Sequence, residues 1–266
     1  MVPHYERALI VGSGSGLSAS LARLFAGQGM RIGLAARNVD KLAALAAETG
    51  AAVHACDASR PGEVEALFAR LEPALGGHPD VVVYNASGRL RGPFVDLDPE
   101  AVAQALMVTA YGGFLVAQAA AKRMLPARHG AILFTGASAS VKGFAGSAPF
   151  AMGKFGLRGL SQSLSRELQP KGIHVANVIV DGAIRNPARG GEPADAPDST
   201  LGPDAVARPT ATSSARIAAP GPPRSSCAPG SSASERVSPP GMPGARGASP
   251  PGSPRRGNGR RRSPTR

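Results

Sequence analysis

An apolar run near the N-terminus ends in three alternate glycines, and this stretch constrains the fold of the chain most. Residues 9–11 are apolar, glycines follow at Gly12, Gly14 and Gly16, and a helical pattern begins at Leu17. The stretch predicts a strand, a tight turn and a helix N-terminus. A turn with so few Cβ atoms lets backbone N–H groups approach an anion, and the helix dipole favours negative charge at the same point. We therefore expect the turn to bind a phosphate group.

Two spacings within the turn match nucleotide-binding patterns. Gly14-x-Gly16-x-x-Ala19 fits the dinucleotide fingerprint loosely, and Gly12-x-x-x-Gly16-x-Ser18 is a wider arrangement. We expect the wider one to apply. The residues that would then hold the cofactor phosphates are Gly12, Ser13, Ser15, Gly16 and Leu17.

Apolar runs alternate with helical patterns along the first two thirds of the chain. Strands are expected at residues 8–11, 31–35, 52–55, 81–84, 131–134 and 174–180. Helices are expected at residues 17–28, 39–48, 63–75, 99–125 and 149–168. Strict alternation of this kind predicts an α/β fold with a doubly wound parallel sheet in three layers. Ligands of such sheets bind beyond the carboxyl ends of the strands.

Two of these strand ends carry residues suited to an adenosine moiety. Arg37 follows the second strand, where NAD-binding versions of the fold place a carboxylate, and a guanidinium there can pair with a 2′-phosphate. Arg37 therefore favours NADP(H) over NAD(H), the alternative being a solvated arginine. Asp57, followed by Ala58, ends the third strand and can accept a hydrogen bond from an adenine amino group, or cap a helix.

The fourth strand ends in Tyr84-Asn85-Ala86-Ser87, and at this point the chain resembles the short-chain dehydrogenase/reductase family, which has an Asn-Asn-Ala-Gly motif here. The resemblance covers residues 6 to about 187. It rests on motifs in the family's order: the wider glycine spacing, Asp57, Asn85-Ala86, Lys154 and Asp181-Gly182. It implies a Rossmann-type domain that binds a nicotinamide cofactor, with Asn85 and Ala86 among the contacts.

The resemblance also identifies a catalytic helix that lacks the family's acid. The family has Tyr-x-x-x-Lys, and this chain has Phe150 and Lys154 at those positions. Residues four apart share a helix face, so in the family the lysine lowers the pKa of the phenol and holds the nicotinamide ribose. Lys154 can still do the second, but Phe150 cannot donate a proton. The family's serine corresponds to Ser138 or Ser140, of which we favour Ser138.

Two further family positions are altered. Thr109 stands where an asparagine supports a proton relay, and Asp181 replaces the proline of a Pro-Gly loop that meets the nicotinamide carboxamide. Gly182 and Ile184 in that loop still match. The resemblance thus implies an NADP(H)-dependent oxidoreductase of small carbonyls or alcohols with a non-standard proton donor. The donors that the sequence offers are Ser138, Ser140, Tyr111, and Lys154 acting through a water.

A second hypothesis from another class is a cofactor-binding module without turnover. In either case we expect a small-molecule ligand, no metal, and a homo-oligomer among intact relatives. Cys56 and Cys227 are too few for a disulfide framework, and residues 1–7 lack a signal-peptide layout, so we expect a cytoplasmic setting. Residues 101–121 carry no charge and are long enough for a membrane span. Gln104, Gln118 and a Gly112-Gly113 pair favour instead a helix packed between a sheet and another subunit.

Positive charge is concentrated at the C-terminal end. Residues 205–266 hold 11 Arg, no Lys and 1 acidic residue, and so carry +10 of the net charge of +12. We therefore infer no nucleic-acid partner for residues 1–204, which are nearly neutral. Residues 188–266 are rich in Pro, Gly, Ser and Arg and predict a disordered tail after a domain spanning residues 1–187.

The composition of this tail suggests a reading-frame change. Arginine without lysine, together with Pro, Gly, Ala and Ser, is what GC-rich DNA encodes when it is read out of frame, and a shifted frame can supply a tryptophan, which the chain lacks. We hypothesise a frameshift near residue 208 that replaced the final helix and seventh strand of the family.

Overall fold

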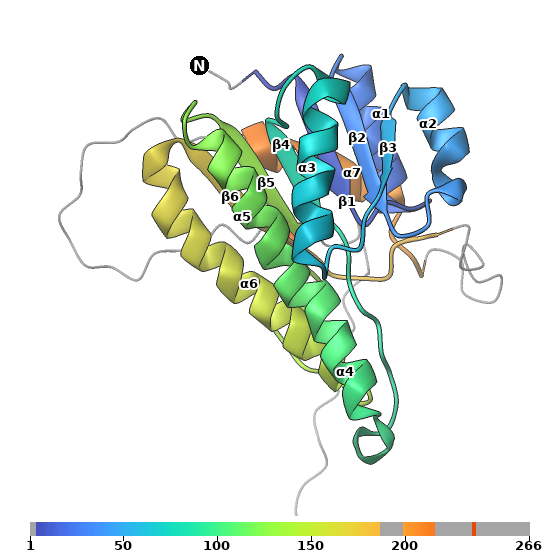
Figure 1. The fold of residues 1–266 in the computed structure, drawn as a ribbon. Helices are drawn as coiled ribbons and strands as arrows, with labels where there is room; N and C mark the ends of the chain where they lie inside the picture. Colours follow the sequence, from blue (N-terminus) through green and yellow to red (C-terminus); the bar gives the residue numbers. More distant parts are fainter. Residues whose placement is uncertain (1–3, 187–198, 216–235, 238–266) are drawn as a thin grey trace, which may run out of the picture.

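The computed structural model describes residues 4–186, 199–215 and 236–237, and it contains a seven-stranded parallel sheet (Figure 1). The strand order is β3-β2-β1-β4-β5-β6-β7, and every neighbouring pair is parallel. The strands are β1 (Arg7–Val11), β2 (Arg31–Ala36), β3 (Ala52–Ala55), β4 (Val81–Tyr84), β5 (Gly130–Thr135), β6 (Ile173–Val180) and β7 (Arg236–Val237). From β1 the chain adds β2 and β3 toward one edge of the sheet, and it then crosses back to place β4 on the other side of β1. This reversal opens a crevice at the carboxyl ends of β1 and β4, and the predicted fold class is confirmed.

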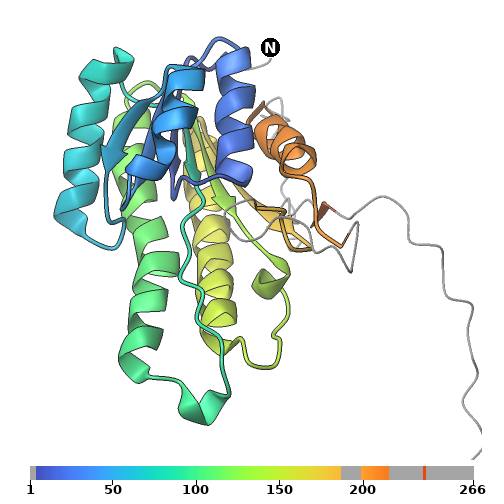
Figure 2. The same ribbon diagram turned by 90° about the vertical axis from the view of Figure 1, so that its right-hand side faces the viewer.

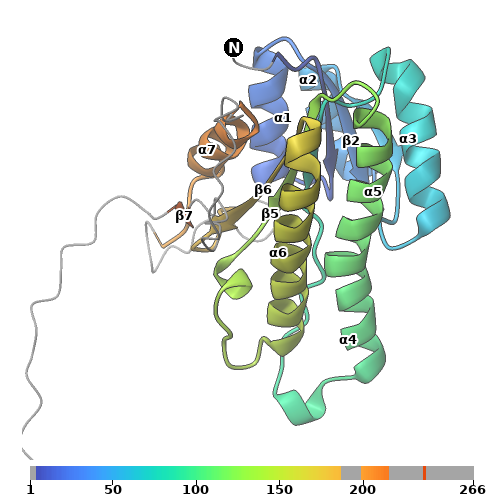
Figure 3. The same ribbon diagram turned by 90° about the vertical axis from the view of Figure 1, so that its left-hand side faces the viewer.

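Helices cover both faces of the sheet (Figures 2 and 3). One face packs against α1 (Leu17–Gly27), α2 (Ala43–Thr49) and α7 (Pro203–Ala215), and the other against α3 (Pro61–Leu75), α5 (Gly112–Met124) and α6 (Ala148–Leu168). Short helical turns complete the chain: η1 (Asp40–Leu42), η2 (Phe94–Asp96), η4 (Ser138–Ser140) and η5 (Gln169–Lys171).

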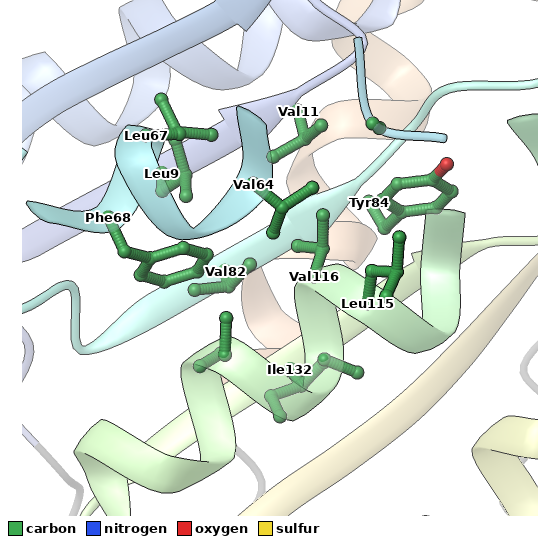
Figure 4. Packing of buried hydrophobic residues seen from close by; sticks show 14 of the residues in the cluster. Leu9, Val11, Val64, Leu67, Phe68, Val82, Tyr84, Leu115, Val116 and Ile132 are labelled. Atoms are coloured by element: carbon green, nitrogen blue, oxygen red, sulfur yellow. The ribbon is translucent and has the colours of Figure 1, made fainter. Parts of the chain in front are cut away.

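The central strands are apolar on both faces because both faces are covered. Along β1, Ala8 and Ile10 belong to the core beneath α1, whereas Leu9 and Val11 belong to the core beneath α3 and α5. Figure 4 shows the second of these cores between β1, β4 and the two helices. This alternation fixes the strand register, and with it the level at which each strand ends at the crevice.

The helix expected at residues 99–125 is continuous but has a different winding in its middle. It consists of α4 (Pro99–Leu106), a π-helical turn η3 (Met107–Tyr111) and α5. By length and hydropathy Pro99–Met124 would suffice to cross a membrane. In this fold Leu115 and Val116 of α5 are buried against the sheet.

The described part of the C-terminal region corrects two expectations. Residues 205–215 were predicted to lack any helix, yet α7 spans Pro203–Ala215 and buries Val206, Ala207 and Ala211 against α1 and the sheet. The hypothesis also predicted the loss of the seventh strand, but the short β7 pairs with the end of β6. The predicted domain boundary at residue 187, Cys227 and the rest of the predicted tail lie outside the described residues.

Candidate functional site

A cavity of about 740 Å³ lies at the carboxyl ends of the strands. It gathers the sequence-predicted cofactor residues from six segments of the chain. All of them line it: Gly12, Ser13, Ser15, Gly16, Leu17, Arg37, Asp57, Ala58, Asn85, Ala86, Lys154, Gly182 and Ile184. Phe150 lines it too, whereas Ser138 is not among the lining residues.

The glycine turn is shaped by the close approach of the β4 end. Gly12 has φ of +85°, and a Cβ there would lie 2.3 Å from the backbone nitrogen of Ala86. The N–H groups of Gly12 and Ser13 donate to the Ala35 carbonyl at 2.9 and 3.0 Å, which joins the turn to β2. A Cβ at Gly14 would meet no atom within 4 Å, so the turn is open on that side. An open glycine turn before a helix N-terminus fits a phosphate-bearing nucleotide.

Asn85 fastens β4 to this turn. The Asn85 Nδ2 donates to Ser18 Oγ at 2.6 Å, and Ser18 Oγ in turn donates to the Gly12 carbonyl at 3.3 Å. The backbone N–H of Asn85 donates to the Val11 carbonyl. On the other side of the turn, Ser15 Oγ donates to Asn186 Oδ1 at 2.8 Å. The turn is therefore held between the segments that follow β4 and β6.

One end of the cavity carries the groups expected for an adenosine. Arg37 is exposed there, together with Lys41, which the sequence analysis did not single out. Burial opposes ionisation of Asp57, but hydrogen bonds from Ser59 and the charges of Arg37 and Arg60 outweigh it and hold the pKa of Asp57 below its usual range. Because Asp57 Oδ1 already accepts the Ser59 hydroxyl and N–H, one of its two oxygens closes a local turn.

Lys154 and Phe150 stand at the other end of the cavity. The Lys154 side chain is almost fully buried, and its Nζ donates to the Thr135 carbonyl at 2.6 Å and lies 5.8 Å from the centre of the Phe150 ring. Burial, with a smaller contribution from the charge of Arg89, lowers the pKa of Lys154 from 10.5 to about 7. An amine with this pKa can exchange a proton at neutral pH.

Thr109 positions this end of the site. A Cβ on Gly153 would lie 2.8 Å from Thr109 Cβ, so α6 approaches η3 closely next to Lys154. Thr109 Oγ1 also accepts the N–H of Gly88 at 2.9 Å. Thr109 thus joins α6 to the loop after β4.

The other predicted proton donors are engaged elsewhere. Ser138 Oγ donates to Asp181 Oδ1 at 2.6 Å, and the buried Ser140 Oγ accepts the N–H of Ala137. Tyr111 stacks on Phe114 with 6.1 Å between ring centres. Of these predicted donors, Lys154 is the one that lines the cavity.

Sequence reasoning missed Arg89. Its guanidinium carbon lies 5.5 Å from the centre of the Phe150 ring, and the residue lines the cavity. Its position just beyond the end of β4, four residues after Asn85, was the available signal.

Comparison with known proteins gives consistent matches. Residues 11–207 match a family model described as enoyl-(acyl carrier protein) reductase, one of the short-chain dehydrogenase/reductase models. The chain is 31% identical to the 3-oxoacyl-[acyl-carrier-protein] reductase of Bos taurus over 178 residues, which cover 66% of this chain and 74% of that protein.

Two solved structures have a similar fold. A short-chain dehydrogenase from Rhodopseudomonas palustris is 31% identical, with a TM-score of 0.66 and coverage of 79% of this chain and 92% of that one. A metagenomic short-chain oxidoreductase in complex with NADP is 27% identical, with a TM-score of 0.66 and coverage of 78% and 89%.

Proposed function

The chain belongs to the short-chain dehydrogenase/reductase family and is an oxidoreductase of that type, and we propose that it transfers a hydride between NADP(H) and the carbonyl or alcohol group of a small substrate. One observation carries this proposal: the residues expected to hold the dinucleotide line a single cavity that ends at Phe150 and Lys154. When bound there, the cofactor would supply or accept the hydride.

The preference for NADP(H) over NAD(H) rests on Arg37. Its exposed guanidinium follows β2 at the end of the cavity that also holds Lys41. Two cations there suit the additional phosphate of NADP(H). A similar solved structure contains NADP, which supports the same choice.

We assign the proton exchange to Lys154. Hydride transfer to a carbonyl develops negative charge on oxygen, and a positioned acid contributes about 10²- to 10⁴-fold to such a reaction. Phe150 has no proton to give, and the lowered pKa of Lys154 leaves both of its protonation states populated near neutral pH. We propose that Lys154 delivers the proton through a water, which makes a slow enzyme rather than an inert one.

The test measures cofactor binding and turnover separately. NADPH binding is followed by its fluorescence, and NADPH consumption by absorbance across a panel of ketones and aldehydes. We expect both in the unmodified chain, and Lys154→Met should abolish consumption. The exposed Lys142 provides the matched control, and Lys142→Met should leave consumption unchanged. Binding without consumption of any substrate would favour the second function, a non-catalytic binding module.

We also propose that the chain forms a homo-oligomer. Large apolar side chains are exposed along two adjacent segments, with Met107, Tyr111 and Phe114 on the α4–α5 helix and Met152 and Phe155 on α6. A second copy would cover these side chains. Light scattering of the purified chain should give at least twice the monomer mass, and a monomer at micromolar concentration would contradict the proposal.

A further inference from the structure

Lys154 is a buried amine at the wall of a cavity. The chain has five lysines, and the other four, Lys41, Lys122, Lys142 and Lys171, are all exposed. Lys154 is 3% exposed, yet it lines the cavity of about 740 Å³. Its amine is therefore shielded from bulk solvent while it borders a space that a small ligand can enter.

The surroundings of Lys154 favour the neutral amine over the ammonium. The centre of the apolar Phe150 ring lies 5.8 Å from Nζ. Among the described residues that line the cavity, Asp57 is the sole carboxylate, and it lies with Arg37 at the other end. Burial is the main cause that lowers the pKa of Lys154 from 10.5 to about 7, so about half of these amines carry a free lone pair at neutral pH.

The position of this amine is fixed by packing and by one hydrogen bond. Nζ donates to the Thr135 carbonyl at 2.6 Å. A Cβ on Gly153 would lie 2.8 Å from Thr109 Cβ, so α6 and η3 are in close contact next to Lys154. A neutral amine that donates one N–H group still has its lone pair, and a desolvated lysine of this kind can act as a nucleophile toward carbonyl compounds.

We propose that Lys154, when no cofactor is bound, forms an imine with small aldehydes and unhindered ketones. The amine attacks the carbonyl carbon, a C–N bond forms, and one amine proton reaches the carbonyl oxygen to give a carbinolamine. The second amine proton and the hydroxyl group then leave as water while the C=N bond forms. The reaction needs no oxidant or reductant. This inference goes beyond the proposed hydride transfer and does not depend on it.

The test is reductive trapping of the imine in the full chain at pH 7 without cofactor. Propanal and sodium cyanoborohydride are added, and the reductant converts any imine to a stable secondary amine. Peptide mapping by mass spectrometry follows the alkylation of each lysine over time. Lys154 should be alkylated at least about tenfold faster than each of the four exposed lysines, because a far larger fraction of it is neutral. This comparison within one chain needs no variant.

Two variants and the oxidised cofactor provide the controls. Lys154→Met retains an unbranched apolar side chain and should lose the fast alkylation. The matched variant Lys142→Met removes an exposed lysine and should leave the alkylation of Lys154 unchanged. NADP⁺ cannot reduce an imine, and its binding is confirmed by calorimetry. Bound NADP⁺ should slow the alkylation of Lys154 and leave that of Lys142 unchanged, because it would fill the cavity that Lys154 lines.

The outcomes separate this inference from the proposed function. Fast alkylation of Lys154 in a chain that consumes NADPH with no carbonyl compound would support the inference and contradict the function. Consumption of NADPH, together with alkylation of Lys154 no faster than that of the exposed lysines, would support the function and overturn the inference. The inference is also overturned if bound NADP⁺ leaves the fast alkylation unchanged, since the reactive amine would then not face the cavity.

Discussion

Arg37 is the residue that should decide between the two nicotinamide cofactors. If it pairs with the 2′-phosphate, NADPH should bind more tightly than NADH, and Arg37→Asp should reverse this order. The lost charge-assisted pair is worth about 1.5–3 kcal/mol. Dissociation constants from fluorescence titration check this. Arg166 is exposed on α6 and does not line the cavity, and Arg166→Asp controls for the change in net charge. Equal affinities for both cofactors in the unmodified chain would contradict the assignment.

Lys154 should make the stability of the cofactor-free chain depend on pH. Its folded pKa of about 7 lies below the ordinary value of 10.5, mainly because of burial. The unfolded chain therefore binds more protons between these two values, and stability rises with pH across this window. Below it, the cost of burying the ammonium is fully present. The unfolding free energy of the unmodified chain, relative to Lys154→Met, should increase between about pH 7 and pH 10 in denaturant titrations. Parallel curves for the two proteins would show that Lys154 is not desolvated.

At the residue scale, the sequence predicted the positions that depend on local pattern. The glycine turn follows from that pattern, whereas Asn85 and Lys154 were identified by the resemblance to the family's motifs, and all of them line the cavity. Arg89 and the Ser138–Asp181 hydrogen bond were not predictable in this way. Both depend on how loops from different strands meet, and a sequence pattern carries little information about that.

At the scale of elements, the predicted alternation was accurate because the apolar periodicity of buried strands and amphipathic helices is strong. The helix α7 was missed because its buried face after residue 207 is mostly polar, with Ala211 the apolar residue among those described there. Thr210 and Ser213 are buried there, and their hydroxyls donate to the carbonyls of Val206 and Pro209. Pro209 within the helix weakened the pattern further. Tertiary packing against α1 explains this helix better than its own propensity does.

The packing of α7 yields a stability prediction. Val206 is fully buried against the core beneath α1, so Val206→Ala should lower the free energy of unfolding by about 1–3 kcal/mol. Thr212 lies on the exposed side of the same helix, and Thr212→Ala should change it by less than about 0.5 kcal/mol. Denaturant unfolding compares the two variants. Equal, negligible effects would mean that α7 contributes nothing to the folded domain.

On the scale of the whole molecule, the C-terminal region bears on the hypothesised frameshift. Buried polar residues, Thr210 and Ser213, occur on α7 only after residue 208, where the composition suggested a frameshift, although Ala211 is buried there too. The hypothesis remains a prediction, and resequencing the gene in independent isolates tests it. An unbroken frame in all of them would refute it.

On the scale of the whole molecule, both halves of the sheet contribute residues to one cavity. The turn after β1, the ends of β2 and β3 and the start of α1 surround the part assigned to the adenosine and phosphates. The ends of β4, β5 and β6, with α6, surround the part assigned to the reaction. Phe150 lines the second of these parts, so Phe150→Tyr would add a phenol where the proposed reaction takes place.

The most direct measurement is therefore NADPH consumption by the unmodified chain and by Phe150→Tyr with neutral ketones. Phe94→Tyr, at an exposed position of η2 that does not line the cavity, is the control. We predict slow consumption by the unmodified chain, a rise of about 10²-fold or more in Phe150→Tyr, and no change in the control. If both the unmodified chain and Phe150→Tyr bind NADPH but consume none with any carbonyl compound, the chain is not a hydride-transfer enzyme.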